Sequence, residues 1–395
     1  MNRPLHYAAL LVIALLLAAC NGAGGGPEAT PTATREPIST PTVAPATTST
    51  PLPTSTPAIP DAPPSTALDL PDGFTAYAIA NGFYRATSIA LASDGTIYVS
   101  ERHGTVYRLA DSDGDGVFEQ RVRFAGFGET EITGIVFAPD GSLYVAVTGR
   151  VVAVSDTDGD GVGDARRDVI GDLPFGLHQN NGMVFGPDGK LYITNGSTCD
   201  ECAQTDERSA TILQSNADGS GLRVYARGLR NPYDLAFDSQ GRLWATDNGS
   251  DAPCATIDEL NLVIDGGDYG WPYGSDCDAY RSGIVPAADL GLHTAATGIE
   301  EYDGNHFPAQ FRGNLFLTLW GKFFGPSGPD ALVLLRVVID ETADGPQATV
   351  LPFASGFEHP IDVLMDRDGT LLVLDYGSGG DDPPSGTLYR IVYTG

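Results

Sequence analysis

The stretch NGMVFGPDGKLYIT, residues 181–194, places two runs of strand-forming residues on either side of a Pro-Asp-Gly turn. This is a β-hairpin pattern, because β-branched and aromatic residues favour strands and Asp-Gly favours a tight turn. The phrase returns as TSIALASDGTIYVS at 87–100, TGIVFAPDGSLYVA at 133–146, YDLAFDSQGRLWAT at 233–246 and IDVLMDRDGTLLVL at 361–374. The sequence therefore predicts a repeated hairpin.

The turn glycines of these copies are evenly spaced. Gly95, Gly141, Gly189 and Gly241 follow one another at intervals of 46, 48 and 52 residues, and Gly369 comes 128 residues later. The last interval requires a degenerate copy, for which RGNLFLT at 312–318 is the candidate. Four-stranded units that repeat every 40–50 residues or so are typical of propeller blades. We predict an all-β, six-bladed β-propeller; the alternative, a β-sandwich, would show less regular spacing.

Propeller geometry sorts the polar residues by position. The first strand of each hairpin descends along the central channel and the second returns, so residues just before the first and just after the second share one rim. Ligand pockets of ring-shaped folds commonly lie there. The rim positions with side chains suited to chemistry are Arg85, Glu101, Arg102, His178, Gln179, Asn195, Arg230, Asn231, Asp247, Asn248, His359, Asp375 and Tyr376.

The charge balance limits the partners of this chain. Its 395 residues include 22 Lys and Arg against 51 Asp and Glu, a net charge of −29. Nucleic acid and anionic lipid both require a basic face, so we expect no nucleic-acid partner and no electrostatic membrane binding. The 49 glycines suit a turn-rich β protein better than a helical one.

The N-terminus carries the features of an export signal. Arg3 precedes an apolar run at 8–19 that is too short to cross a hydrocarbon core of about 30 Å. LAAC at 17–20 resembles a bacterial lipobox, which implies that residues 1–19 form a lipoprotein signal peptide and that Cys20 is lipidated. The alternative is an ordinary signal peptide. We expect a lipid-anchored protein outside the cytoplasm, at the cell surface or in the periplasm.

Residues 20–66 after the signal are rich in Pro, Thr and Ser. Such a segment cannot bury a core, and we expect it to form an extended, unpaired linker. The folded domain is expected to occupy residues 67–395.

Three polar residues have side chains suited to redox or proton chemistry. His178 provides an imidazole that is neutral near pH 7, a natural general base for a sugar hydroxyl. Arg230 offers a permanently charged fork of donors for carboxylate or quinone oxygens. Lys322 follows an apolar strand, whereas the other lysine, Lys190, follows a turn glycine and is expected to face solvent. A structural histidine and an arginine paired with a blade carboxylate are the alternatives.

Two acidic loops, DSDGDG at 111–116 and DTDGDG at 156–161, resemble the start of a calcium-binding loop. Neither has the Glu expected at position twelve, although Glu119 or Asp164 could replace it. The alternative is a solvated turn between strands. The candidate ligands for structural calcium are Asp111, Asp113, Asp115, Asp156, Asp158 and Asp160.

Four cysteines remain besides Cys20, an even number that usually means disulfides outside the cytoplasm. Among three possible connectivities we favour Cys199–Cys202 with Cys254–Cys277, and a zinc site is the alternative. Ala203 follows Cys202 where a c-type haem motif would need histidine, so no such haem is expected.

Residues 70–393 resemble the soluble quinoprotein glucose and sorbosone dehydrogenases, six-bladed propellers that use pyrroloquinoline quinone (PQQ). The best stretches are SER at 100–102, LPFGLHQNNGMVFGPDGKLYIT at 173–194, GLRNPYDLAFDSQGRLWATDNG at 228–249, DELN at 258–261 and GDYGWP at 267–272. The resemblance implies a dehydrogenase that oxidises the anomeric hydroxyl of an aldose or related sugar and passes electrons to an external acceptor.

The resemblance also implies roles for single residues. His178 would take the proton from the anomeric hydroxyl while hydride moves to the quinone. Arg230 and Asn231 would contact the quinone oxygens, and Lys322 would reach the cofactor from a loop. Calcium that polarises the quinone would be held by backbone carbonyls near Gly249 and Ser250.

Two departures from the family pattern stand out. Where members with the glucose-enzyme pattern have two arginines before the last hairpin, this chain has Glu358 and His359. PQQ carries three carboxylates, so its binding would need Arg85, Arg102 or His359 to compensate; the alternative is a divergent substrate or a cofactor-free relative. The Gln-Gly-Pro calcium loop of the family is replaced by Asn-Gly-Ser at 248–250.

Two other functions fit the same rim. One is a calcium-dependent lactonase-type hydrolase, in which Glu101, Asn195 or Asn231, and Asp247 hold the metal directly. The other is a non-catalytic surface module that binds glycan or protein.

Overall fold

The computed structural model describes residues 59–250, 256–272, 283–322, 331–342, 345–379 and 383–395. Apart from one short 3-10 turn, η2 (Ala309–Phe311), the regular structure within these ranges is entirely β. This part of the chain contains no helix with the length and apolar character needed to cross a membrane.

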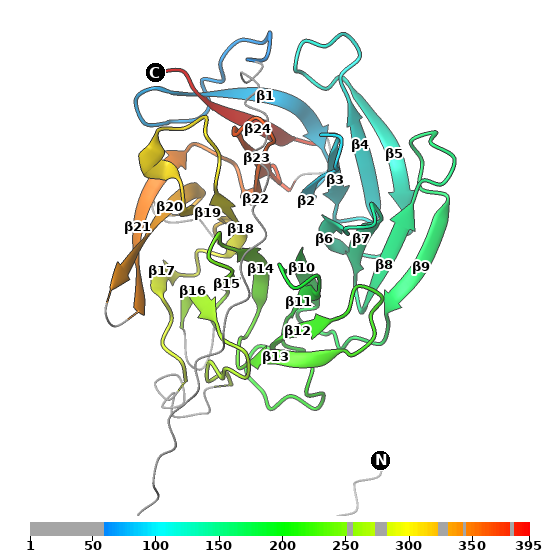
Figure 1. The fold of residues 1–395 in the computed structure, drawn as a ribbon, viewed down its shortest axis with the longest axis vertical. Coiled ribbons are helices and arrows are strands. Elements are labelled where there is room, and N and C mark those ends of the chain that lie inside the picture. The colour runs from blue at the N-terminus through cyan, green and yellow to red at the C-terminus, as the bar shows by residue number, and fades with distance from the viewer. Residues whose placement is uncertain (1–58, 251–255, 273–282, 323–330, 343–344, 380–382) are drawn as a thin grey trace, which may run out of the picture. The chain divides into compact units, whose positions relative to one another are not determined.

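The strands form six four-stranded antiparallel sheets arranged around a ring, so the six-bladed propeller is confirmed (Figure 1). Five sheets use four consecutive strands each, and the sixth combines the last three strands with the first. In chain order the blades are β2 (Ala86–Leu91), β3 (Ile97–Glu101), β4 (Thr105–Ala110), β5 (Gln120–Gly126); β6 (Ile132–Phe137), β7 (Leu143–Val147), β8 (Arg150–Ser155), β9 (Ala165–Ile170); β10 (Asn180–Phe185), β11 (Leu191–Asn195), β12 (Thr211–Ser215), β13 (Arg223–Arg227); β14 (Pro232–Phe237), β15 (Leu243–Asp247), β16 (Ile257–Val263), β17 (Ala288–Leu292); β18 (Ala296–Tyr302), β19 (Asn314–Leu319), β20 (Val333–Thr342), β21 (Gly345–Ser355); and β22 (Pro360–Met365), β23 (Leu371–Asp375), β24 (Gly386–Tyr393), β1 (Phe74–Phe83).

The predicted hairpins are the two inner strands of blades one to four and six. Their turn glycines, from Gly95 to Gly369, all have positive φ, between 73° and 94°, which L side chains rarely adopt. In blade five the degenerate copy supplies β19, and a longer loop that contains η2 separates it from β18. The sequence pattern is weak there because a longer loop replaces the tight turn.

Pairing of β1 with β24 closes the ring, with Phe74 opposite Tyr393. The segment just before β1 also lies on the propeller: the Asp61 N–H donates to the Asp115 carbonyl at 2.8 Å. These residues had been assigned to the linker by composition, so the tail of that segment contacts the folded unit.

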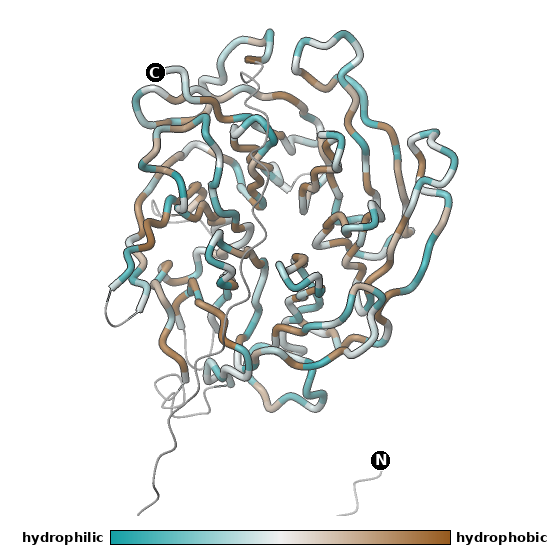
Figure 2. Tube along the Cα trace, in the orientation of Figure 1, coloured by the Kyte–Doolittle hydropathy of each residue, from teal (hydrophilic) through white to brown (hydrophobic). Residues whose placement is uncertain are grey.

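The core is divided among the interfaces between blades. In the described residues each of the six interfaces buries its own cluster of apolar side chains, such as Tyr144, Leu191 and Ile193 between blades two and three. Hydrophobic residues follow the strands, whereas many of the outer loops are hydrophilic (Figure 2). A blade is therefore stable only between two neighbours.

The six inner strands line a central channel that holds a cavity of about 210 Å³. Three carboxyl groups line it: Asp234, Glu300 and Asp362. Burial raises the pKa of Glu300 to about 8 and that of Asp362 to about 6, and it raises the pKa of Asp234 as well, with the Asp362 charge adding to the effect.

Candidate functional site

The predicted rim residues lie where inner strands begin or their neighbours end. His178 and Arg230 each precede an inner strand by two residues, β10 and β14, and His359 immediately precedes β22. Arg102 follows β3, and Lys322 follows β19. Because paired strands run antiparallel, all five positions are on one face of the ring.

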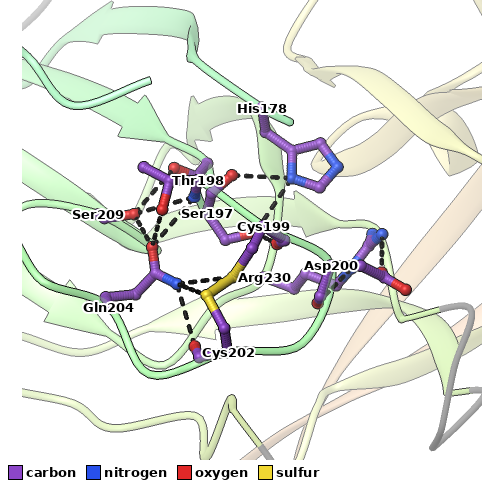
Figure 3. The surroundings of a disulfide bond; sticks show 10 residues. His178, Ser197, Thr198, Cys199, Asp200, Cys202, Gln204, Ser209 and Arg230 are labelled. Carbon is purple, nitrogen blue, oxygen red and sulfur yellow. Dashed lines mark hydrogen bonds and ion pairs between the residues drawn. A yellow bond between two sulfur atoms is a disulfide. The ribbon is translucent and has the colours of Figure 1, made fainter. Parts of the chain in front are cut away.

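His178 is fixed by the turn that follows β11. Its Nδ1 lies 3.1 Å from the Ser197 carbonyl oxygen and 3.0 Å from Ser197 Oγ (Figure 3). Since Ser197 Oγ donates its own hydrogen to the Cys199 carbonyl at 2.7 Å, it can only accept from the imidazole. Nδ1 therefore carries the ring hydrogen, and Nε2 is the basic nitrogen.

The surroundings of His178 favour the neutral ring. Burial, followed by the charge of Arg230, lowers its pKa to about 4, against the opposing effects of the Ser197 hydrogen bond and the Asp200 carboxylate. An imidazole with this pKa is unprotonated at pH 7 and can accept a proton through Nε2.

Arg230 lies next to His178 and is only 5% exposed. Its Nε and Nη2 donate to Asp200 Oδ1 at 3.0 and 2.5 Å, and its Nη1 donates to the Asn248 carbonyl at 3.1 Å. The pairing of this arginine with a carboxylate, which the sequence left as an alternative, is therefore present, with a partner from a loop of the adjacent blade.

The backbone joins the two groups. The His178 N–H donates to the Ser197 carbonyl, and the Ser197 N–H donates to the Arg230 carbonyl at 2.8 Å. A Cβ atom at Gly196 would lie 2.5 Å from His178 Cβ and 2.7 Å from Asn231 Oδ1. Only glycine allows these side chains to approach so closely.

Strand-end acids support the rim loops. Asp247 accepts the N–H groups of Arg230 and Asn231 at 3.0 and 2.7 Å. In the sixth blade Asp375 accepts the His359 N–H in the same way, at 2.8 Å. These carboxylates replace missing strand partners, so their role is structural.

Arg102 and His359, expected to compensate for the missing arginines, already have partners. Arg102 lies 2.8 Å from Glu131, which also accepts a hydrogen bond from Gln179. The His359 ring stacks on Trp320 at 4.3 Å, and its Nδ1 lies 2.8 Å from the Trp320 carbonyl oxygen. Sequence reasoning predicted the Cys199–Cys202 disulfide but missed the contact of Asp200 with Arg230 and the contact of Trp320 with His359.

The other compensating candidate, Arg85, donates from Nε and Nη2 to the Gly379 carbonyl at 3.1 and 2.9 Å. Lys322 is half-buried two residues beyond Trp320.

The turn expected to hold catalytic calcium offers oxygen ligands. Ser250 is fully buried; its N–H donates to Thr256 Oγ1 and its carbonyl accepts the Thr256 N–H. The Asn248 Oδ1 atom is buried and has no hydrogen-bond partner among the described residues. This orphaned amide oxygen precedes Gly249 and Ser250 in the chain, and it is a ligand type that a hard cation prefers.

Both acidic loops gather carboxylates. The ligand oxygens of Asp111, Asp113, Asp115 and Glu119 lie within 4.8 Å of one another, as do those of Asp156, Asp158 and Asp160. Glu119 thus joins the first loop, as expected, whereas Asp164 is outside the second group. Instead it accepts hydrogen bonds from Thr157.

Cys199 and Cys202 form a disulfide, the first of the two favoured pairs. Cys20, Cys254 and Cys277 lie outside the described residues, so lipidation and the second pair stay predictions.

Comparisons with known proteins agree with the fold. An uncharacterised protein of Borreliella burgdorferi is 26% identical over 47% of this chain and 53% of its own length. Quinoprotein glucose dehydrogenase B of Acinetobacter calcoaceticus is 31% identical over 24% of this chain and 25% of its own length. The chain thus spans about half of the first relative and a quarter of the second.

Among solved structures, the PQQ-bound form of aldose sugar dehydrogenase from Streptomyces coelicolor superimposes with a TM-score of 0.63. It is 21% identical and covers 82% of this chain and 100% of that one, which shows a shared fold. A family model described as a domain of unknown function, DUF7133, matches residues 84–319. The chain therefore belongs to the DUF7133 family.

Proposed function

We propose that this chain is an extracytoplasmic oxidoreductase that oxidises the anomeric hydroxyl of an aldose or related sugar, with PQQ and calcium as cofactors. The observation that carries the proposal is the His178–Arg230 pair. A neutral imidazole with a basic Nε2 and a buried guanidinium lie together on one rim. Proton removal from an alcohol needs the first group, and the second suits an anionic electron carrier.

The donor set fits such a carrier. Asn231 Oδ1 accepts a hydrogen bond from Asn181, which leaves the Asn231 amide N–H groups as donors. Arg230, Asn231 and Lys322 would hold the quinone oxygens and carboxylates, and the turn at 248–250 would hold calcium. When bound, PQQ supplies a two-electron acceptor for hydride, and calcium polarises it.

Within this proposal the chain supplies the base and the groups that surround the substrate. His178 Nε2 takes the hydroxyl proton, and Ser197 keeps the ring oriented through Nδ1. Trp320 offers an apolar surface on another part of the rim. The proposed partners are a small sugar and an external electron acceptor, with the membrane reached only through lipid at Cys20. A disulfide suits the proposed compartment.

The lactonase alternative receives less support. Its proposed ligands Glu101 and Asp247 accept backbone N–H groups, from Tyr84 at 2.8 Å and from Arg230 and Asn231, respectively. Asn195 Nδ2 donates to the Pro174 and Arg208 carbonyls, whereas its buried Oδ1 has no hydrogen-bond partner among the described residues. These groups serve the loops of their own rim segments.

Titration of the full chain with PQQ in millimolar calcium, followed by dye reduction with a panel of aldoses, tests the proposal. Saturable binding and sugar-dependent dye reduction are expected. Hydrolysis of lactones without quinone would support the alternative, and inactivity in both assays would favour a binding module.

A further inference from the structure

The Cys199–Cys202 loop contacts both groups that carry the proposed chemistry. The Cys199 carbonyl accepts Ser197 Oγ–H, and Ser197 in turn accepts His178 Nδ1–H. One residue further on, the Asp200 carboxylate lies on Arg230. In Figure 3 the imidazole of His178 lies above the disulfide, and the Asp200–Arg230 pair lies to the right of the disulfide.

Asp200 orients the Arg230 guanidinium without using all of its N–H donors. Oδ1 accepts from Nε and Nη2, and the Asn248 carbonyl accepts from Nη1. A guanidinium has five N–H hydrogens, so the described contacts use three of them. The described contacts leave one hydrogen on each Nη atom unused, and guanidinium hydrogens of this kind can bind a planar pair of oxygens.

The disulfide holds the loop in this position. Only Asp200 and Glu201 separate the two cysteines, so the S–S bond fixes the backbone that carries both Asp200 and the Cys199 carbonyl. Gln204 Nε2 also contacts this loop, 3.2 Å from Cys199 Sγ and 3.1 Å from the Cys202 carbonyl oxygen. Cys202 is exposed, which gives a reductant access to the bond.

We propose that the Cys199–Cys202 loop positions the groups of the site and that Asp200 is the positioning residue for Arg230. Reduction of the disulfide then releases Asp200 and, with it, Arg230. The effect of reduction on catalysis rests on the proposed function. The dependence of the Arg230 position on the disulfide does not require any cofactor.

The redox step balances with an external dithiol. One thiolate of the reagent attacks a disulfide sulfur and displaces the other as a thiolate. The second thiolate of the reagent then displaces the remaining protein sulfur and closes its own disulfide. The reagent loses two electrons and two protons, and Cys199 and Cys202 take up both as two thiols.

Arginine modification in the full chain tests the positioning directly. Phenylglyoxal reacts with accessible guanidinium groups, and peptide mass mapping gives the rate at each arginine. We expect reduction with dithiothreitol, and the variant Asp200→Asn, each to speed modification of Arg230 at least about tenfold. Arg208, paired with Asp206 in the same segment, is the internal control and should keep its rate.

Matched variants distinguish a specific release of Arg230 from a general loss of structure in this segment. Cys199→Ser with Cys202→Ser should behave like the reduced protein without reductant and change no further when reductant is added. Asp206→Asn removes an aspartate from another Asp–Arg pair of this segment and should leave the Arg230 rate unchanged. Arg230 that stays protected after reduction and in Asp200→Asn would overturn the inference.

Calorimetric titration with PQQ in millimolar calcium supplies the second measurement. We expect at least about tenfold weaker binding after reduction and in Asp200→Asn, but not in Asp206→Asn. Tighter binding would overturn the positioning role and make Asp200 a competitor of the cofactor. If the oxidised chain binds no PQQ while Arg230 still becomes reactive on reduction, the cofactor assignment fails and the positioning of Arg230 stands.

Discussion

The rim and the channel beneath it both contain buried charged groups, but they satisfy them differently. On the rim Arg230 and Arg102 each contact a carboxylate, Asp200 and Glu131. In the channel, by contrast, the hydrogen bond described for the Glu300 carboxyl comes from a backbone group, the Met365 N–H. Burial raises the pKa of all three channel acids, Asp234, Glu300 and Asp362, and so favours their neutral form. The rim is therefore arranged for charge chemistry, and the channel for cohesion of the blades.

The largest expected effect tests the rim. His178→Ala removes the proposed base and should lower dye reduction at least about a hundredfold, because positioned general bases commonly contribute that much. The exposed His103 provides a matched control, and His103→Ala should retain activity. Thermal unfolding should be similar in both variants. Unchanged turnover in His178→Ala would remove His178 from the mechanism.

The second prediction concerns the pH profile of activity. Because burial and Arg230 lower the pKa of His178 to about 4, the basic form persists well below the usual histidine range. The acid limb of kcat/KM should therefore lie near pH 4 rather than near about 6.5. A limb near the ordinary value would show that the site is wetter than the structure indicates.

The third prediction tests the channel. Glu300 has a folded-state pKa of about 8, whereas an unfolded Glu ionises near about 4.3. Between these values the folded state binds more protons, so the free energy of unfolding falls as pH rises through this window. Glu300→Gln cannot ionise and should be more stable than the parent at pH 8 in urea titrations.

The exposed Glu129 serves as the control for this experiment, and Glu129→Gln should leave the pH dependence unchanged. An equal pH dependence in Glu300→Gln and the parent would show that this carboxyl is solvated.

The smallest expected effect concerns contacts between blades in the channel. Ser88 Oγ accepts the Ile135 N–H of the next blade at 3.3 Å and also bonds to Asp362. Ser88→Ala should cost about 1 kcal/mol of unfolding free energy, the usual contribution of one buried hydrogen bond. Ser142→Ala, in the half-buried turn between β6 and β7 where Ser142 contacts Ser155, should cost less. An equal loss of unfolding free energy in both variants would mean that the Ser88 contact in the channel contributes no more than the Ser142 contact.

The fold was predictable because the repeat is strong. Alternating strand and turn residues fix where each inner strand starts and ends, which placed His178 and Arg230 on one rim from spacing alone. The same pattern fails in blade five, where a loop with η2 replaces the tight turn. Glu300 of that blade was not predicted as a channel residue, and neither were Asp234 and Asp362 of the well-patterned blades.

The partners of the rim residues could not be predicted in the same way. Asp200 meets Arg230 across a blade interface, 30 residues away in sequence, and the path of an irregular loop decides this contact. Arg102 was expected to be available for a cofactor, but Glu131 lies 29 residues away in sequence and 2.8 Å away in space. Contacts between side chains of different blades do not recur at a fixed interval, so the sequence repeat cannot predict them.

Closure of the ring by β1 and β24 has a consequence for biosynthesis. These strands come from opposite ends of the folded unit, so the sixth blade cannot assemble until β24 has left the ribosome. Until then two blade faces rich in apolar residues stay uncovered. Contacts so distant along the chain slow folding and prolong exposure to aggregation. A chain shortened by its final strand should therefore fail as a whole, although every proposed catalytic residue is still present.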